Sequence, residues 1–151
     1  MYFSTWDTSN FYWSLKGLNF RFATLSQEGN LLVWTIKCVP FGWDKAYYLG
    51  QTLHSNIVSS VPRPPATQFK VYIDDGLNMS PSPDLTTDYT FRVVKKLEDN
   101  HFVISPKSRP YSATEQDYIG KTYANGKISN TGKRLSSLLA YCTWPSLLCQ
   151  L

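Results

Sequence analysis

The chain has 151 residues, of which 42% are hydrophobic and 17% charged, and its formal net charge is +4. This balance excludes a disordered chain, and the length suits one domain over residues 1–151 that buries its own core. Its aromatic content and the strand pattern given below predict that this single domain is all-β. The charge is well short of that of a dedicated nucleic-acid binder, so nucleic acid is not expected as a partner. Aromatic residues make up 15% of the chain, which favours strands.

Targeting and redox signals are sparse. The N-terminal segment 1–7 has no basic region followed by a long apolar run, and no apolar stretch approaches the roughly 20 residues that span a bilayer. Three cysteines without a CxxC pair predict neither a disulfide framework nor a structural zinc site. We therefore expect a soluble, cytoplasmic protein without a membrane association, a metal or a cofactor.

Short segments rich in aromatic and β-branched residues, broken by Gly, Pro, Asn or Asp, are predicted as strands. In chain order they cover residues 11–15, 19–25, 31–39, 46–49, 69–73, 89–94 and 101–104.

The stretches between and after these strands are assigned by their turn chemistry. Two Pro-containing stretches, 54–68 and 77–87, are predicted as loops, and 98–100 as the turn of a hairpin. Asn125-Gly126 predicts another hairpin between short strands, because this dipeptide suits a two-residue turn. The tail over 135–148 is expected to form a short helix that runs into a strand.

Three segments centred on an aromatic residue recur at 32–36, 89–93 and 141–144, and the first two are each followed by a second strand. The stretches GNLLVWTIKC…AYYLG at 29–50 and DYTFRVVKKLEDNHFVISP at 88–106 resemble β-trefoil proteins such as fungal protease inhibitors, Kunitz-type inhibitors and ricin-B-like lectins. The resemblance implies a threefold barrel that binds a peptidase or a sugar.

Two departures from the trefoil pattern leave other folds open. The Gln-x-Trp motif of the sugar-binding branch is absent, and few residues follow Trp144 to complete a third repeat. A two-sheet sandwich or a jelly roll also accommodates short strands joined by turns.

Catalytic signatures are weak. His54 and His101 are the only histidines, and there is no Gly-x-Ser-x-Gly elbow. The paired carboxylates Asp74-Asp75 and Glu98-Asp99 adjoin turns, where such residues serve local hydrogen bonding, so we predict turns there rather than a glycosidase or calcium site. We therefore expect no catalytic residues and no enzyme.

Recognition is expected from loops on a rigid β scaffold. The Pro-rich loop 54–66 would present His54, Asn56, Arg63 and Pro64 to a partner, in the manner of a peptidase inhibitor. In the alternative, a carbohydrate-binding module, Phe41 and Trp43 would stack on a sugar. A structural, capsid-type subunit is a third possibility. The expected partner is accordingly a protein or a carbohydrate.

Overall fold

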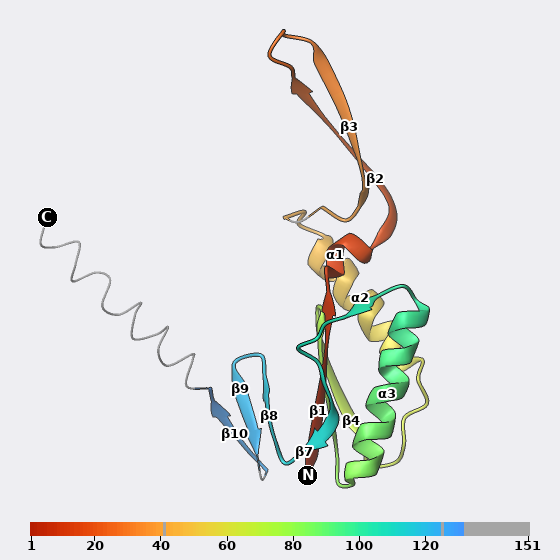
Figure 1. Cartoon of the computed structure of the whole chain (residues 1–151), viewed down its shortest axis with the longest axis vertical. Coiled ribbons are helices and arrows are strands. Elements are labelled where there is room, and N and C mark those ends of the chain that lie inside the picture. The colour runs from red at the N-terminus through yellow and green to blue at the C-terminus, as the bar shows by residue number, and fades with distance from the viewer. Residues whose placement is uncertain (41, 125, 132–151) are drawn as a thin grey trace, which may run out of the picture.

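The computed structural model describes residues 1–40, 42–124 and 126–131. Its centre is an antiparallel sheet in the order β4-β5-β1-β6, with β7 also paired to β1 (Figure 1). The strands of this central sheet are β1 (Tyr2–Ser9), β4 (Gln68–Tyr72), β5 (Asp75–Ser80), β6 (Val103–Ile104) and β7 (Arg109–Ala113).

Two small sheets and three helices complete the described fold (Figure 1). The small sheets are the hairpin of β2 (Lys16–Leu25) and β3 (Leu31–Cys38), and the antiparallel set β8 (Glu115–Tyr118), β9 (Lys121–Ala124) and β10 (Lys127–Asn130). The helices are α1 (Phe11–Ser14), α2 (Ala46–Ser59) and α3 (Pro83–Asp99).

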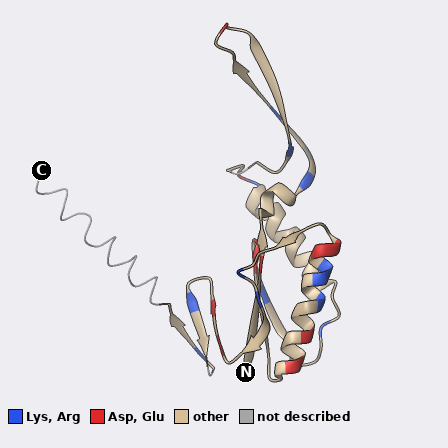
Figure 2. Ribbon diagram, in the orientation of Figure 1, with Lys and Arg blue, Asp and Glu red and all other residues tan. Residues whose placement is uncertain are grey.

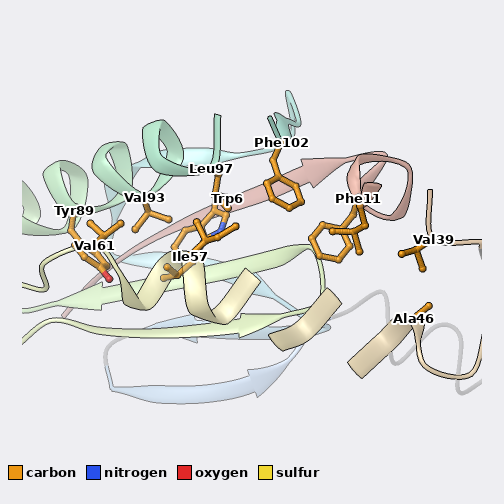
Figure 3. Packing of buried hydrophobic residues seen from close by; sticks show 12 residues of the cluster. Trp6, Phe11, Val39, Ala46, Ile57, Val61, Tyr89, Val93, Leu97 and Phe102 are labelled. Carbon is orange, nitrogen blue, oxygen red and sulfur yellow. The ribbon is translucent and has the colours of Figure 1, made fainter. Parts of the chain in front are cut away.

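The two faces of strand β1 have different roles, because successive side chains of a strand point to opposite sides. One face carries Trp6, which is 1% exposed and packs in the main core with residues of α2 and α3. Figure 3 shows Trp6 between Leu97 of α3 and Ile57 of α2. The other face carries Phe3, which joins Tyr118 and Tyr123 of the small β8–β9–β10 sheet in a second buried cluster.

Helix α3 begins with ordinary capping signals. Ser82 precedes it and its hydroxyl accepts a hydrogen bond from the backbone N–H of Leu85, while Pro83 occupies the first turn. Its buried residues recur every three or four positions, which is the spacing of one helical face. They are Thr86, Tyr89, Thr90, Val93 and Leu97.

The β-rich prediction is confirmed, but the chain is not all-β and the β-trefoil prediction is wrong. No sheet is closed within the described residues, whereas a trefoil needs a barrel. Segments 46–49 and 89–94, predicted as strands, lie in α2 and α3. Their helical period was hidden because the buried faces include polar residues such as His54, Thr86 and Thr90.

Some of the other local predictions are confirmed and others are wrong. Strands at 19–25, 31–39 and 69–73 and the hairpin around Gly126 are confirmed. Three predictions are wrong. The predicted strand at 11–15 is mostly helix α1, and the predicted loop at 77–87 contains most of β5 and the start of α3. The predicted hairpin with its turn at 98–100 is absent, because its first strand lies in α3. The tail at 135–148 and the third repeat segment at 141–144 lie outside the described residues.

The β2–β3 hairpin projects from the rest of the fold, and Figure 2 shows little charge along it. Cross-strand partners Phe22 and Trp34 stack on each other, with ring centroids 6.5 Å apart, yet both are about half exposed. Among the described residues, no helix combines the length and apolar character needed to cross a membrane.

A buried polar seam joins α3 to the central sheet. Asn78 of β5 donates from its amide nitrogen to the Thr86 carbonyl oxygen at 2.9 Å and to the Thr90 hydroxyl oxygen at 3.0 Å. The Thr90 hydroxyl also lies 2.6 Å from that of Ser4 on β1. All four side chains are fully buried, so their hydrogen bonds depend on one another.

We expect Asn78→Ala to lower the free energy of unfolding by about 2–3 kcal/mol, because the substitution removes the donor to the buried oxygens of Thr86 and Thr90 and leaves a small cavity. Urea unfolding followed by circular dichroism measures this. The matched control is Asn56→Ala on the exposed side of α2, which should change stability by less than about 0.5 kcal/mol. Equal effects of the two substitutions would contradict a structural role for the seam.

Candidate active site

Two carboxylates face each other across neighbouring strands. Asp7 of β1 is the direct register partner of Asp75 of β5, so their side chains leave the same face of the sheet. This face is the one opposite Trp6, away from the helices. Asp74 lies in the turn that precedes β5, and its carbonyl oxygen accepts hydrogen bonds from the backbone N–H and the hydroxyl of Thr8, both at 3.1 Å.

The turn that carries Asp74 is strained. Tyr72 of β4 pairs with Asp75, so Ile73 and Asp74 are its two central residues. Ile73 has a φ of 54°, the sign that a type II′ hairpin turn needs at its first central position and that a β-branched residue rarely adopts. Such strain costs about 1–3 kcal/mol, and it tends to occur at functional sites.

The segment between β6 and β7 braces Asp7. The Asp7 carbonyl oxygen accepts hydrogen bonds from the Ser105 backbone N–H at 2.7 Å and from the Ser108 hydroxyl at 3.2 Å. The Asp7 backbone N–H donates to the Ser108 hydroxyl oxygen at 2.9 Å. The same segment places Lys107 beside the carboxylates, where its charge lowers the pKa of Asp75.

Burial first and neighbouring negative charges second determine the electrostatics of the group. Burial, reinforced by the charges of Asp74 and Asp7, raises the pKa of Asp75 to about 6. Burial also raises the pKa of Asp74, to which the Asp7 charge adds. Within the described residues the one ion pair joins Arg92 and Asp88 on α3, and neither residue belongs to this group. The folded state therefore holds like charges together without an ion pair.

A pH prediction follows for Asp75. Because its folded pKa is raised, the folded state holds the proton more tightly than the unfolded state between about pH 4 and about pH 6, so stability should fall as pH rises through this window. Asp75 is partly exposed, so we expect a loss on the order of 1 kcal/mol. Urea unfolding of the wild type and of Asp75→Asn at about pH 4 and about pH 7 measures this. A wild type and variant with the same pH dependence would contradict it.

An open groove of about 850 Å³ borders the carboxylates. Asp7 and Asp75 lie along it together with the cationic side chains of Lys107 and Arg109. A smaller groove lies beside it, and Tyr118 and Ile119 line both grooves. Strands β4 and β9 each contribute one lysine and one tyrosine to the smaller groove. These four residues are Lys70, Tyr72, Lys121 and Tyr123.

Tyrosines lie close to Asp74. Burial raises the pKa of Tyr12, and the charge of Asp74 and the neighbouring Tyr47 and Tyr72 raise it further. The rings of Tyr47 and Tyr72 meet edge to face with centroids 6.3 Å apart, and each is nearly half exposed. Asp74 therefore borders an accessible aromatic surface as well as the other two carboxylates.

No three Asp, Glu, His or Cys side chains in the described part of the chain are grouped so that they could hold a metal ion by themselves. Magnesium does not require such a cage, because it retains waters and is usually held by one or two carboxylates together with substrate phosphates. Asp7 and Asp75 are opposite each other in the strand register, and no ion pair in the described residues involves either carboxylate. The carboxylates thus fit a magnesium ion that shares its ligands with a phosphate.

The residues predicted to contact a partner do not form one site. His54 and Asn56 lie in α2 rather than in an extended loop, because the helix continues to Ser59, and His54 is fully buried. Arg63 and Pro64 lie beyond the helix in the segment before β4. Trp43 packs edge to face against Phe20, with centroids 5.0 Å apart. Phe41 lies outside the described residues.

The sequence matches no protein-family model and no curated protein. Its fold is similar to that of solved foamy viral protease-reverse transcriptase chains. The foamy viral protease-reverse transcriptase in complex with RNA/DNA hybrid aligns with a TM-score of 0.69 and 20% identity, over 95% of the present chain and 21% of the viral chain. A complex of the dRH form with dsDNA aligns with a TM-score of 0.67 and 21% identity over 87% of this chain and 22% of that chain.

This likeness shows a shared fold, and the chain spans about a fifth of the length of those two neighbours. It contradicts the predicted trefoil and the functions inferred from it, a peptidase inhibitor or a lectin with a protein or carbohydrate partner. It also contradicts the expectations that the chain is not an enzyme and that nucleic acid is no partner. What the chain has in common with these neighbours is the fold of one part of them.

The carboxylate group was missed because each member had a plausible local explanation. Asp74 and Asp75 adjoin a turn, and turns favour Asp for its backbone hydrogen bonds. Strand β1 was not predicted, so Asp7 had no assigned position. The available signal was the charge itself, since Asp7 interrupts a strand with buried Trp6 and Thr8 on either side.

Proposed function

We propose that this chain is the catalytic core of a nucleic-acid polymerase of the reverse-transcriptase kind, which adds nucleotides to a primer strand. The observation that supports this most strongly is the position of Asp7 opposite Asp75, with Asp74 in the adjoining strained turn. Asp7 and Asp75 share one face of a sheet whose fold is found in viral protease-reverse transcriptases, and Asp74 directly precedes Asp75.

Nucleotide addition brings the negatively charged phosphates of the nucleoside triphosphate next to the primer end and the carboxylates. The 3′-hydroxyl oxygen of the primer bonds to the α-phosphorus of a nucleoside triphosphate, the bond to pyrophosphate breaks, and the hydroxyl proton leaves to solvent. Asp7, Asp74 and Asp75 would hold divalent cations, which neutralise phosphate charge and favour the ionised hydroxyl. The carboxylates supply the binding charge, and the strained turn keeps Asp74 beside Asp75.

The grooves around the carboxylates suit a polyanionic substrate. Lys107 and Arg109 lie along the groove that contains Asp7, and Lys70 and Lys121 line the neighbouring one. Cationic side chains along a groove contact phosphates and position a strand without reading its sequence. The tyrosines beside Asp74 offer flat faces to a sugar or a base.

Primer extension tests the proposal. The full chain is incubated with a primer annealed to an RNA or DNA template, nucleoside triphosphates and Mg²⁺. Extension that requires Mg²⁺ and template supports the function. Binding of Mn²⁺, measured by electron paramagnetic resonance, provides a second readout that does not depend on turnover. A chain that neither extends primers nor binds Mn²⁺ at these carboxylates contradicts the proposal.

A further inference from the structure

A buried histidine connects strand β1, which carries Asp7, to the turn that carries Asp74. His54 of α2 is fully buried below the sheet, on the face opposite Asp7. Its Nε2 atom lies 3.0 Å from the indole Nε1 of Trp6, and its Nδ1 atom lies 2.6 Å from the carbonyl oxygen of Ile73. Trp6 immediately precedes Asp7, and Ile73 immediately precedes Asp74.

The hydrogen bonds determine which ring nitrogen of His54 carries the proton. The indole N–H of Trp6 only donates, so Nε2 must accept and is deprotonated. Nδ1 therefore carries the hydrogen and donates to the Ile73 carbonyl oxygen. Burial lowers the pKa of His54, which favours this neutral ring. A doubly protonated ring would direct an N–H at the Trp6 N–H and lose that bond.

Gln51 holds the same turn through the other backbone group of Ile73. Its amide oxygen accepts a hydrogen bond from the Ile73 backbone N–H at 2.8 Å, and its amide nitrogen donates to the Val71 carbonyl oxygen at 3.0 Å. Gln51 and His54 are three residues apart on α2 and so share a helical face. Together they bind both the N–H and the carbonyl of the strained residue Ile73.

We propose that Gln51 and His54 are positioning residues that fix the Asp74 turn relative to Asp7, and this inference rests on the proposed function. His54 joins strand β1 to the turn through Trp6 and Ile73, while Gln51 holds the turn in its unfavourable backbone conformation. The hydrogen bonds of both side chains go to Trp6, Ile73, Val71 and Ser55 and not to a carboxylate, so both act through their neighbours.

A core-filling role alone predicts something different. If His54 only occupied volume, an apolar residue of similar size would replace it without effect on the carboxylates. The strain at Ile73 argues for the positioning role, because an unfavourable φ persists only where surrounding contacts impose it. Removing those contacts should let the turn relax and displace Asp74.

Four variants of the full chain test the proposal. His54→Leu removes both hydrogen bonds of His54, His54→Asn retains a donor near the Nδ1 position, and His54→Gln retains an acceptor near the Nε2 position. Gln51→Met removes the bonds of Gln51 to Ile73 and Val71, together with its bond to Ser55 on the same helix. The matched control is Asn56→Leu, an exposed position on the same helix. Circular dichroism establishes that each variant is folded.

Two readouts separate positioning from packing. By nuclear magnetic resonance, the amide signals of Asp74 and Asp75 should shift or broaden in His54→Leu and Gln51→Met, while those of Tyr2 and Ser80 at the far end of the sheet stay in place. By electron paramagnetic resonance, Mn²⁺ affinity should fall about tenfold in both variants and about threefold in His54→Asn and His54→Gln, the smaller loss being the partial rescue.

The outcomes are distinguishable. Unchanged Asp74 and Asp75 signals with unchanged Mn²⁺ affinity in folded His54→Leu and Gln51→Met would overturn the positioning role. If His54→Leu does not fold, His54→Asn and His54→Gln decide in the same way, since each removes one bond. A wild-type chain that neither extends primers nor binds Mn²⁺ overturns the proposed function instead, and the resonance shifts still decide whether the two residues hold the turn.

Discussion

Asp7→Asn should reduce Mg²⁺-dependent primer extension roughly a hundredfold to a thousandfold and greatly weaken Mn²⁺ binding. The amide is nearly the same size as the carboxylate, so the strand pairing of Asp7 with Asp75 is retained. The substitution removes one negative charge from the face where phosphate and metal would meet. Extension of a labelled primer and Mn²⁺ titration by electron paramagnetic resonance measure the two effects.

The same substitution should raise the stability of the fold. Like charges directly opposite each other on neighbouring strands destabilise a sheet, and the Asp7 charge contributes to the raised pKa of Asp75. We therefore expect Asp7→Asn to increase the free energy of unfolding at neutral pH while activity is lost. This opposite movement is typical of a site that accepts strain for function.

The matched control is Asp88→Asn on α3. It makes the same chemical change at an exposed position whose carboxylate pairs with Arg92 on the helix surface, 3.0 Å away. Exposed pairs of this kind contribute less than about 1 kcal/mol, so neither stability nor extension should change much. Comparable losses of extension in Asp88→Asn and Asp7→Asn would show that net charge, and not the carboxylate group, is responsible.

The sequence predicts those elements of the fold that are determined by residues close to one another in the chain. The β2–β3 hairpin was predictable because alternating aromatic residues flank a turn centred on Gly29, and its strands pair with each other alone. Helices α2 and α3 were not, since their buried faces include His54, Thr86 and Thr90, whose burial depends on hydrogen bonds to distant strands.

The carboxylate site depends on a pairing that no local pattern specifies. Asp7 and Asp75 meet only because β1 enters the sheet beside β5, between strands from distant parts of the chain. The same applies to His54, which as a single buried histidine has no recognisable motif. Its meaning depends on Trp6 and Ile73 lying at its two ring nitrogens.

Gly76→Ala should produce the largest loss of stability, about 3 kcal/mol or more. Gly76 of β5 is the register partner of Trp6, and a Cβ at this position would overlap the Trp6 indole ring. Pairing with β1 on one side and β4 on the other fixes the Gly76 backbone, and packing fixes the 1% exposed indole. Urea unfolding followed by tryptophan fluorescence measures the loss.

The control for backbone conformation is Gly29→Ala. Gly29 has a φ of 81° and open space around its Cβ position, so alanine there meets conformational strain alone, worth about 1 kcal/mol. A loss in Gly76→Ala no larger than in Gly29→Ala would contradict the clash. It would show that the sheet can move to accept a side chain.

A double-mutant cycle assigns the loss to the indole. In a Trp6→Leu background the smaller side chain leaves room for a Cβ, so Gly76→Ala should cost less there than in the wild type, with a coupling of about 1–3 kcal/mol. Trp6→Leu also removes the donor to His54 Nε2, so the Asp74 signals should shift as they do in His54→Leu. Gly76 would then serve the carboxylates indirectly: without a side chain of its own, it leaves room for the Trp6 indole, whose N–H donates to His54.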